Sequence, residues 1–115
     1  MSTETLSIDP KTSENARIYG LLSAAVGPRP IAFASTLDAE GKPNLAPYSF
    51  FNVFSSNPPI VVFSPVRRGR DNTTKHTLDN ILATREVVIN MVNYAMVQQM
   101  SLASTEYEAV YQSRF

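Results

Sequence analysis

The feature that most restricts the fold is the stretch "NLAPYSFFNVFSSNPP", residues 44–59. Its four aromatic side chains give it the composition of a β-strand: Tyr48, Phe50, Phe51 and Phe54. Pro47 interrupts it, and proline has no backbone N–H with which to bond a neighbouring strand. The segment is therefore expected to be an edge strand or to carry a bulge at Pro47. A bulge would leave nearby backbone groups in need of other partners.

The surrounding patterns predict an order of elements typical of a small antiparallel barrel. Residues 13–26 have the apolar spacing of a helix, with Ser13 as its N-cap and Gly27 as its end. A strand at 31–37 and a second strand that begins at Asn44 would form a hairpin, in whose turn Gly41 supplies a positive φ. Four further elements are expected: a strand at 60–65 covered on both faces, a helix at 77–85, an interior strand at 86–92 and a helix at 94–104. Because alternating βαβ units are absent, we expect a mainly β fold with short flanking helices rather than a doubly wound sheet.

Length and composition indicate a single domain without a metal centre. Of the 115 residues, 1–12 read as a polar lead and 13–115 as the domain. Ten Lys and Arg balance ten Asp and Glu. This balance argues against the alternative of a small barrel that binds single-stranded nucleic acid through its aromatic side chains and basic loop, because such grooves are normally strongly basic. There is no cysteine, and His76 is the only histidine, so we expect no metal site. No signal-peptide pattern or apolar run of about 18 residues is present, so we expect a soluble, cytoplasmic protein.

The hairpin at residues 31–59 is the first candidate site. Ser35 and Thr36 end the first strand, opposite the hydroxyl and amide side chains of the proline-broken stretch and its aromatic residues. Apolar walls with a few convergent polar groups are typical of a site for a flat heteroaromatic ligand. The alternative is that these polar groups belong to surface turns and the aromatic residues to the core.

The second candidate site is the basic segment 64–77. It carries four cations, Arg67, Arg68, Arg70 and Lys75, and leads into a helix that Thr77 could cap. Cationic side chains beside a helix start bind phosphate well, although such a loop is also common as a solvated surface. The pattern is not a Walker loop. A ring site and a phosphate site together predict a mononucleotide, such as a flavin.

These residues also form a recognisable set of motifs. "RPIAFAST", the Asp-x-x-Gly turn, "NLAPYSFFN", "PP" before an apolar strand and K-x-T-x-x-N-I follow one another between residues 29 and 81. Over residues 16 to 107 the chain resembles the flavin reductase-like family of FMN-binding split barrels, which includes flavoredoxin. The resemblance implies a Greek-key split β-barrel that forms a homodimer with FMN at the interface. Its members reduce flavin with NADH or NADPH, often for a partner monooxygenase, while others hold FMN as electron carriers or storage modules.

The resemblance also implies roles for individual residues, none of them catalytic. Ser35 and Thr36 would contact the flavin ring or ribityl chain. The ring would be lined by Asn44, Ala46, Pro47, Tyr48 and Ser49. The phosphate would be held by Ser64, Arg67, Lys75 and Thr77, with Asn80 supporting that loop. On the last helix, Met96 and Met100 would face the core or a dimer partner.

Two departures from the family pattern stand out. His76 lies where relatives usually carry Asp, and neutral histidine can still accept a hydrogen bond. The chain ends at Phe115, before the further strands that the resemblance implies. It is therefore expected to be a fragment, a truncated reading frame or a domain completed by a partner, with an exposed barrel edge.

Overall fold

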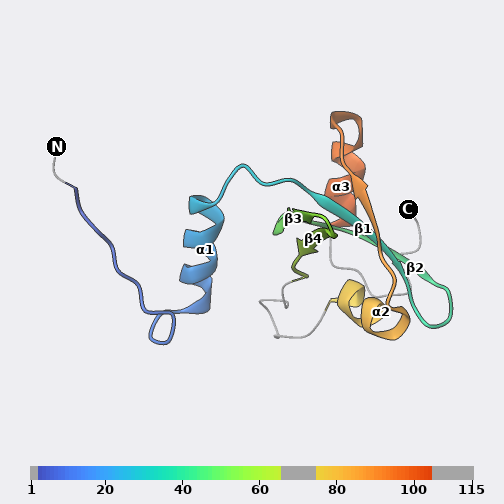
Figure 1. The fold of residues 1–115 in the computed structure, drawn as a ribbon, viewed down its shortest axis with the longest axis horizontal. Helices are drawn as coiled ribbons and strands as arrows, with labels where there is room; N and C mark the ends of the chain where they lie inside the picture. Colours follow the sequence, from blue (N-terminus) through green and yellow to red (C-terminus); the bar gives the residue numbers. More distant parts are fainter. Residues whose placement is uncertain (1–2, 66–74, 105–115) are drawn as a thin grey trace.

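The computed structural model describes residues 3–65 and 75–104, which form two small antiparallel sheets and short helices (Figure 1). In chain order the elements are α1 (Asn15–Ala25), β1 (Ala32–Leu37), β2 (Pro43–Tyr48), β3 (Phe51–Ser56), β4 (Pro59–Phe63), α2 (His76–Thr84), β5 (Val88–Met91), the 3-10 turn η1 (Tyr94–Met96) and α3 (Val97–Ala103). The mainly β fold with short helices is confirmed. Arg67 and the other arginines of the basic segment lie outside the described residues.

β1 is the central strand of the first sheet, with β2 and β5 antiparallel on its two sides. The turn between β1 and β2 is built around Asp38, whose carboxylate accepts hydrogen bonds from the backbone N–H groups of Glu40 (2.8 Å) and Lys42 (2.9 Å). Gly41 has a φ of 84°, as the turn prediction required. The predicted hairpin is therefore present.

Pro47 lies on the outer strand β2, opposite Phe33, and the pairing runs without a break from Pro43 to Tyr48. The edge-strand alternative is confirmed, and the alternative of a bulge at Pro47 is wrong. On an edge strand the position that lacks an N–H can face away from the ladder, so no bulge is needed.

The proline-broken stretch is two strands rather than one. After a bend at Ser49 and Phe50 the chain enters β3, which pairs with β4 in the second sheet, and the register shifts between Val53 and Ser55. We refer to β3 and β4 together as the ribbon. The residues before the bend therefore belong to the first sheet, and those after it belong to the second.

The expectation that residues 60–65 are covered on both faces is wrong for this chain. Ile60 is 43% exposed, Val61 51% and Val62 48%. Only β3 and β4 pair in this sheet, and the described residues do not supply layers that bury both faces. Likewise, β5 is an edge rather than an interior strand, with Val88 and Met91 exposed, and it is shorter than predicted.

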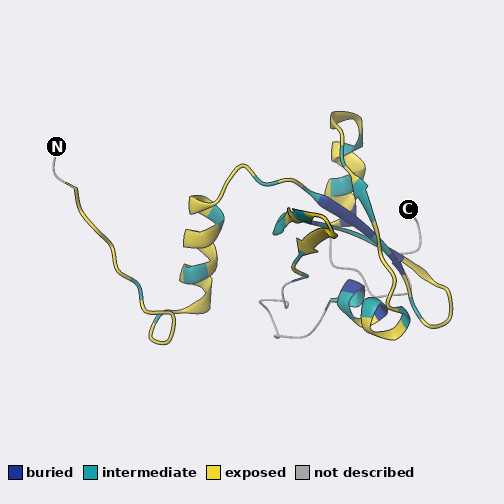
Figure 2. Ribbon diagram, viewed as in Figure 1, coloured by how far each residue is buried: buried dark blue, intermediate teal, exposed yellow. Residues whose placement is uncertain are grey.

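Burial is concentrated where β1 and β2 meet α2, as Figure 2 shows in dark blue. Ala32, Ala34 and Tyr48 form the buried apolar cluster, and four partly buried side chains pack against it: Ala46, Phe51, Phe63 and Ile89. α3 packs against β2, with Met96 and Met100 half-buried and Tyr94 exposed. Four buried polar side chains adjoin the same region: Thr36, Asn44, Thr77 and Asn80.

The three helices form close to where the sequence predicts them, but both predicted N-caps are wrong. Glu14, not Ser13, is the N-cap of α1, and Lys75, not Thr77, is the N-cap of α2. Neither cap makes a side-chain hydrogen bond to the helix, and Thr77 lies inside the first turn of α2. Thr77 is unavailable as a cap because its hydroxyl bonds to β2 instead, as described below. Over the residues that the structure describes, no helix combines the length and apolarity needed to cross a bilayer.

Candidate functional site

A buried hydrogen-bond network fastens the first turn of α2 to β2. The Thr77 hydroxyl oxygen accepts from the Asn44 side-chain amide (2.9 Å) and from the Tyr48 hydroxyl (2.7 Å). Thr77 is only 1% exposed. Because a hydroxyl oxygen has two acceptor positions, this arrangement uses both of them.

A second buried bond lies nearly one helical turn further along α2. The Asn80 side-chain amide donates to the hydroxyl of Thr36 on β1 over 3.0 Å. Both side chains are buried. The two contacts fix α2 along its length across the β1–β2 hairpin. Thr36, Asn44, Thr77 and Asn80 therefore have polar atoms engaged with one another inside the protein.

One acceptor in this network has no partner. The side-chain carbonyl oxygen of Asn44 is buried, and no described group donates to it. An unsatisfied buried acceptor costs about 1–3 kcal/mol, so such a group normally meets a donor. The side-chain oxygen of Asn44 is thus an unsatisfied acceptor of this network among the described residues.

A cavity of about 110 Å³ opens beside this network, where α1, β2 and the start of α2 meet. It is lined by Tyr19, Pro47, Tyr48, Ser49, Phe50, Ser64 and Lys75. The Ser64 backbone N–H donates to the Phe50 carbonyl over 2.9 Å, which holds the end of β4 to the bend. The cavity therefore collects residues from both candidate sites of the sequence analysis.

The Lys75 ammonium lies 5.4 Å from the centroid of the Tyr48 ring, within the range of a cation–π contact. This distance joins the residue predicted to hold a phosphate to one predicted to line a ring. With Thr77 bonded to Tyr48, the bend and the start of α2 are close enough for one mononucleotide to touch both. The spatial requirement of the sequence-based hypothesis is met within a single chain.

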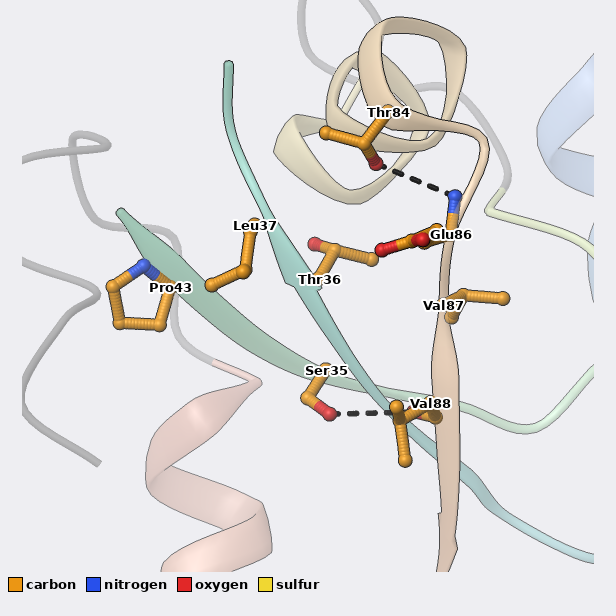
Figure 3. A pocket seen from close by; sticks show the side chains of 8 residues that line it. All are labelled: Ser35, Thr36, Leu37, Pro43, Thr84, Glu86, Val87 and Val88. Atoms are coloured by element: carbon orange, nitrogen blue, oxygen red, sulfur yellow. Dashed lines mark hydrogen bonds between the residues drawn. The ribbon is translucent and has the colours of Figure 1, made fainter. Parts of the chain in front are cut away.

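Ser35 and Thr36 line a different cavity, of about 160 Å³, between β1 and the link from α2 to β5 (Figure 3). Its other lining residues are Leu37, Pro43, Thr84, Glu86, Val87 and Val88. The Ser35 hydroxyl donates to the Val88 carbonyl over a long 3.4 Å. The structure thus brings Pro47, Tyr48, Ser49, Ser64 and Lys75 together and leaves Ser35 and Thr36 apart from them. Ala46 packs on the apolar cluster.

Two lining or bracing residues were missed by the sequence analysis, namely Tyr19 and Arg29. The Tyr19 and Phe50 rings lie 5.6 Å apart, and the Arg29 guanidinium lies 5.3 Å from the Phe50 centroid. Phe50 lines the cavity, as predicted, whereas Phe54, also expected as a wall, is 69% exposed on the ribbon. The placement of Arg29 between two prolines was the one local hint of its importance.

Comparisons with known proteins identify the family of the chain. The family model for the flavin reductase like domain matches residues 26–112. The structure is similar to that of nitrilotriacetate monooxygenase component B from Bacillus cereus, with a TM-score of 0.81 and 31% identity over 93% of this chain and 52% of that one. It is also similar to 2-nitrobenzoate 2-nitroreductase from Pseudomonas fluorescens, with a TM-score of 0.71 and 34% identity over 89% of this chain and 48% of that one.

A third similar structure, from Shewanella frigidimarina, is described as a flavin reductase with split barrel domain. At 22% identity and a TM-score of 0.66, over 90% of this chain and 51% of that one, it supports the fold alone. The two sheets described above therefore correspond to strands of a split barrel. The fold-class prediction is confirmed.

Sequence relatives match only part of their own length. An uncharacterized protein from Aquifex aeolicus is 39% identical over 97 residues, covering 84% of this chain and 49% of that protein. The uncharacterized protein YwrF from Bacillus subtilis is 40% identical over 83 residues, covering 72% of this chain and 40% of that protein. The chain thus spans about half the length, or less, of the curated relatives it matches. With a family model matched over most of its residues and a split-barrel fold, the chain belongs to the flavin reductase-like domain family.

Proposed function

We propose that this chain binds FMN and is part of an NAD(P)H-dependent flavin oxidoreductase. The observation that carries the proposal is the single cavity that Pro47, Tyr48 and Ser49 share with Ser64 and Lys75. It combines aromatic walls, hydroxyl groups and one cation, which are the groups that a ring with a phosphate tail requires. Membership of the family and the likeness to two proteins named for monooxygenase and nitroreductase functions support the same class of activity.

In this proposal the bend between β2 and β3 receives the ring. Tyr48 and Phe50 offer aromatic faces, and the Ser49 hydroxyl and nearby backbone groups offer hydrogen bonds to the ring edge. The proline-broken stretch would thus serve to carry polar groups beside aromatic walls at one turn of the chain.

The start of α2 receives the phosphate. Lys75 carries the positive charge, Ser64 supplies a hydroxyl, and the first turn of the helix presents backbone N–H groups at the positive end of its dipole. Arg67, predicted for the same role, lies outside the described residues and remains part of the proposal.

Three predicted contact residues, Thr36, Asn44 and Thr77, take a supporting role instead, beside Asn80, which was predicted to support the phosphate loop. Asn44 and Thr77 hold the start of α2 against β2, and Asn80 and Thr36 hold its middle against β1. These bonds keep the phosphate end and the ring end of the cavity at a fixed separation. Ser35, which lies at the other cavity, would act only as part of β1.

FMN held by the cavity residues around Tyr48 and Lys75 would supply the redox chemistry, namely hydride transfer from NADH or NADPH to its N5 atom. The chain's own contribution is to bind the ring, orient it and exclude water from one face, and we assign no acid or base among the cavity residues. We further propose that the full protein is a homodimer with FMN at its interface and passes reducing equivalents to a monooxygenase or another acceptor. The likeness to a protein named as a monooxygenase component supports that partner class.

The test is a titration of the purified chain with FMN and with riboflavin, followed by flavin absorbance and fluorescence. We expect FMN to bind at least about tenfold more tightly than riboflavin, because riboflavin lacks the phosphate. Lys75→Gln should remove most of this preference, while Lys11→Gln, in the exposed lead, should leave it intact.

Anaerobic mixing of the FMN complex with NADH or NADPH then separates the activities. Reduction of the bound FMN by either donor supports the reductase. If FMN binds but neither donor reduces it, the alternative of an electron carrier or storage module is supported instead. A chain that perturbs neither the absorbance nor the fluorescence of FMN overturns the proposal.

A further inference from the structure

Helix α1 touches the rest of the protein through very few groups. It has no buried residue, and Figure 1 shows it standing beside the sheets at the end of a linking segment. Its aromatic contact is between Tyr19 and Phe50, whose ring centroids are 5.6 Å apart. Tyr19 also lines the cavity beside β2. The position of α1 therefore decides whether one wall of that cavity is present.

Arg29 donates hydrogen bonds to the C-terminal end of α1. One guanidinium nitrogen, Nη1, donates to the carbonyl oxygens of Ser23 and Val26, at 2.6 Å each. Carbonyl groups in the last turn of a helix lack intrahelical partners and form the negative end of its dipole. A cationic donor there both satisfies these carbonyl groups and is attracted by the dipole. The hydroxyl oxygen of Ser23 is also buried, beside the Arg29 guanidinium that bonds to the Ser23 carbonyl.

The same guanidinium also reaches the bend that forms the cavity. Its Nε lies 3.4 Å from the Ser49 hydroxyl oxygen, to which it donates, and its central carbon lies 5.3 Å from the Phe50 centroid. Pro28 and Pro30 flank it and restrict the backbone on both sides. A planar fork with several fixed donors can make these contacts at once, whereas a lysine ammonium offers only one nitrogen.

We propose that Arg29 is a positioning residue that holds α1 against the β2–β3 bend and so keeps Tyr19 in the wall of the cavity. Tyr19 is the contact residue in this arrangement, packing beside the ring of the bound heteroaromatic ligand. Arg29 acts through Tyr19 and does not touch the ligand. The inference rests on the proposed function for the identity of that ligand, while the Arg29 contacts themselves do not depend on it.

The first measurement uses the chain without flavin. Hydrogen exchange of residues 15–25 should become at least about tenfold faster in Arg29→Met, because the charge-assisted bonds to the helix end are lost. Exchange in β1 should stay unchanged. Arg29→Lys should be intermediate, and Arg17→Met, an exposed control on α1 itself, should match the wild type. Unchanged protection of α1 in Arg29→Met overturns the proposal.

The second measurement is a double-mutant cycle on the FMN dissociation constant. Tyr19→Ala and Arg29→Met should each weaken FMN binding about tenfold, and the double variant should be little weaker than Tyr19→Ala alone. Additive losses, or loosening of α1 with no change in affinity, would overturn the positioning role. If the wild-type chain binds no FMN, the proposed function fails, whereas the exchange experiment still decides whether Arg29 fixes α1.

Discussion

The β1–β2 hairpin with α2 and the β3–β4 ribbon use similar residues in opposite ways. The first region buries polar side chains, and every one of Thr36, Asn44, Thr77 and Asn80 has a hydrogen-bond partner within the region. The ribbon exposes apolar side chains, among them Phe54 and Val61. Figure 2 shows the contrast as dark blue on β1 and α2 against yellow on the ribbon.

The difference teaches that the environment of a strand depends on what covers it. Asn44–Tyr48, which has one aromatic residue, and Phe51–Ser56, which has two, belong to one continuous stretch. The first half is buried or half-buried because α2 and α3 lie against β2, while the ribbon has no comparable cover among the described residues. The β1–β2 hairpin with α2, which we call the hairpin unit, is therefore held together by its own buried hydrogen bonds, whereas the ribbon exposes apolar surface suited to a further layer of protein.

The largest effect should come from Thr77→Val, which keeps the shape of the side chain but removes the acceptor for Asn44 and Tyr48. We expect the free energy of unfolding to fall by about 2–4 kcal/mol, because two buried hydrogen bonds are lost. Urea denaturation followed by circular dichroism measures it. Thr77→Ser retains the hydroxyl, so its free energy of unfolding should be less than about 1 kcal/mol below that of the wild type. A fall in Thr77→Val no larger than in Thr77→Ser would remove the distinction between the two regions.

A smaller effect is expected from Asn80→Ala, which removes the single bond to Thr36. Unfolding free energy should fall by about 1–2 kcal/mol, and α2 should exchange its amide hydrogens faster. The matched change is Asn52→Ala on the ribbon, where the exposed side-chain oxygen accepts from the adjacent Val53 N–H, at 2.8 Å. It should cost no more than about 0.5 kcal/mol. Equal losses at the two asparagines would contradict the comparison.

Local chemistry explains which parts of the fold the sequence predicts. The β1–β2 hairpin follows from its turn, because Asp38 and Gly41 act within five residues of chain. The helices follow from their apolar spacing in the same way. The assignment of Thr77 as a cap failed because its hydroxyl partners, Asn44 and Tyr48, are about thirty residues away and local pattern does not reveal them.

Burial is harder to predict than strand formation. The apolar run at residues 60–63 does form a strand, as its composition predicts. Composition does not determine whether other elements pack on that strand, and among the described residues Ile60, Val61 and Val62 stay exposed. For the candidate site, motif order correctly suggested that residues near Tyr48 and near Lys75 meet. It gave no hint of Tyr19, whose place beside Phe50 depends on how the segment around Arg29 folds back.

The smallest effect on stability should come from Phe54→Ser on the ribbon. Phe54 is 69% exposed, so little apolar contact is lost and the unfolding free energy should change by less than about 0.5 kcal/mol. Binding of a hydrophobic dye and concentration-dependent self-association should nevertheless decrease, since an exposed apolar surface is removed. Phe54→Leu preserves that surface and should resemble the wild type in both measurements. Destabilisation by more than about 2 kcal/mol would mean that the ribbon is covered within the chain, and the contrast with the hairpin unit would then be wrong.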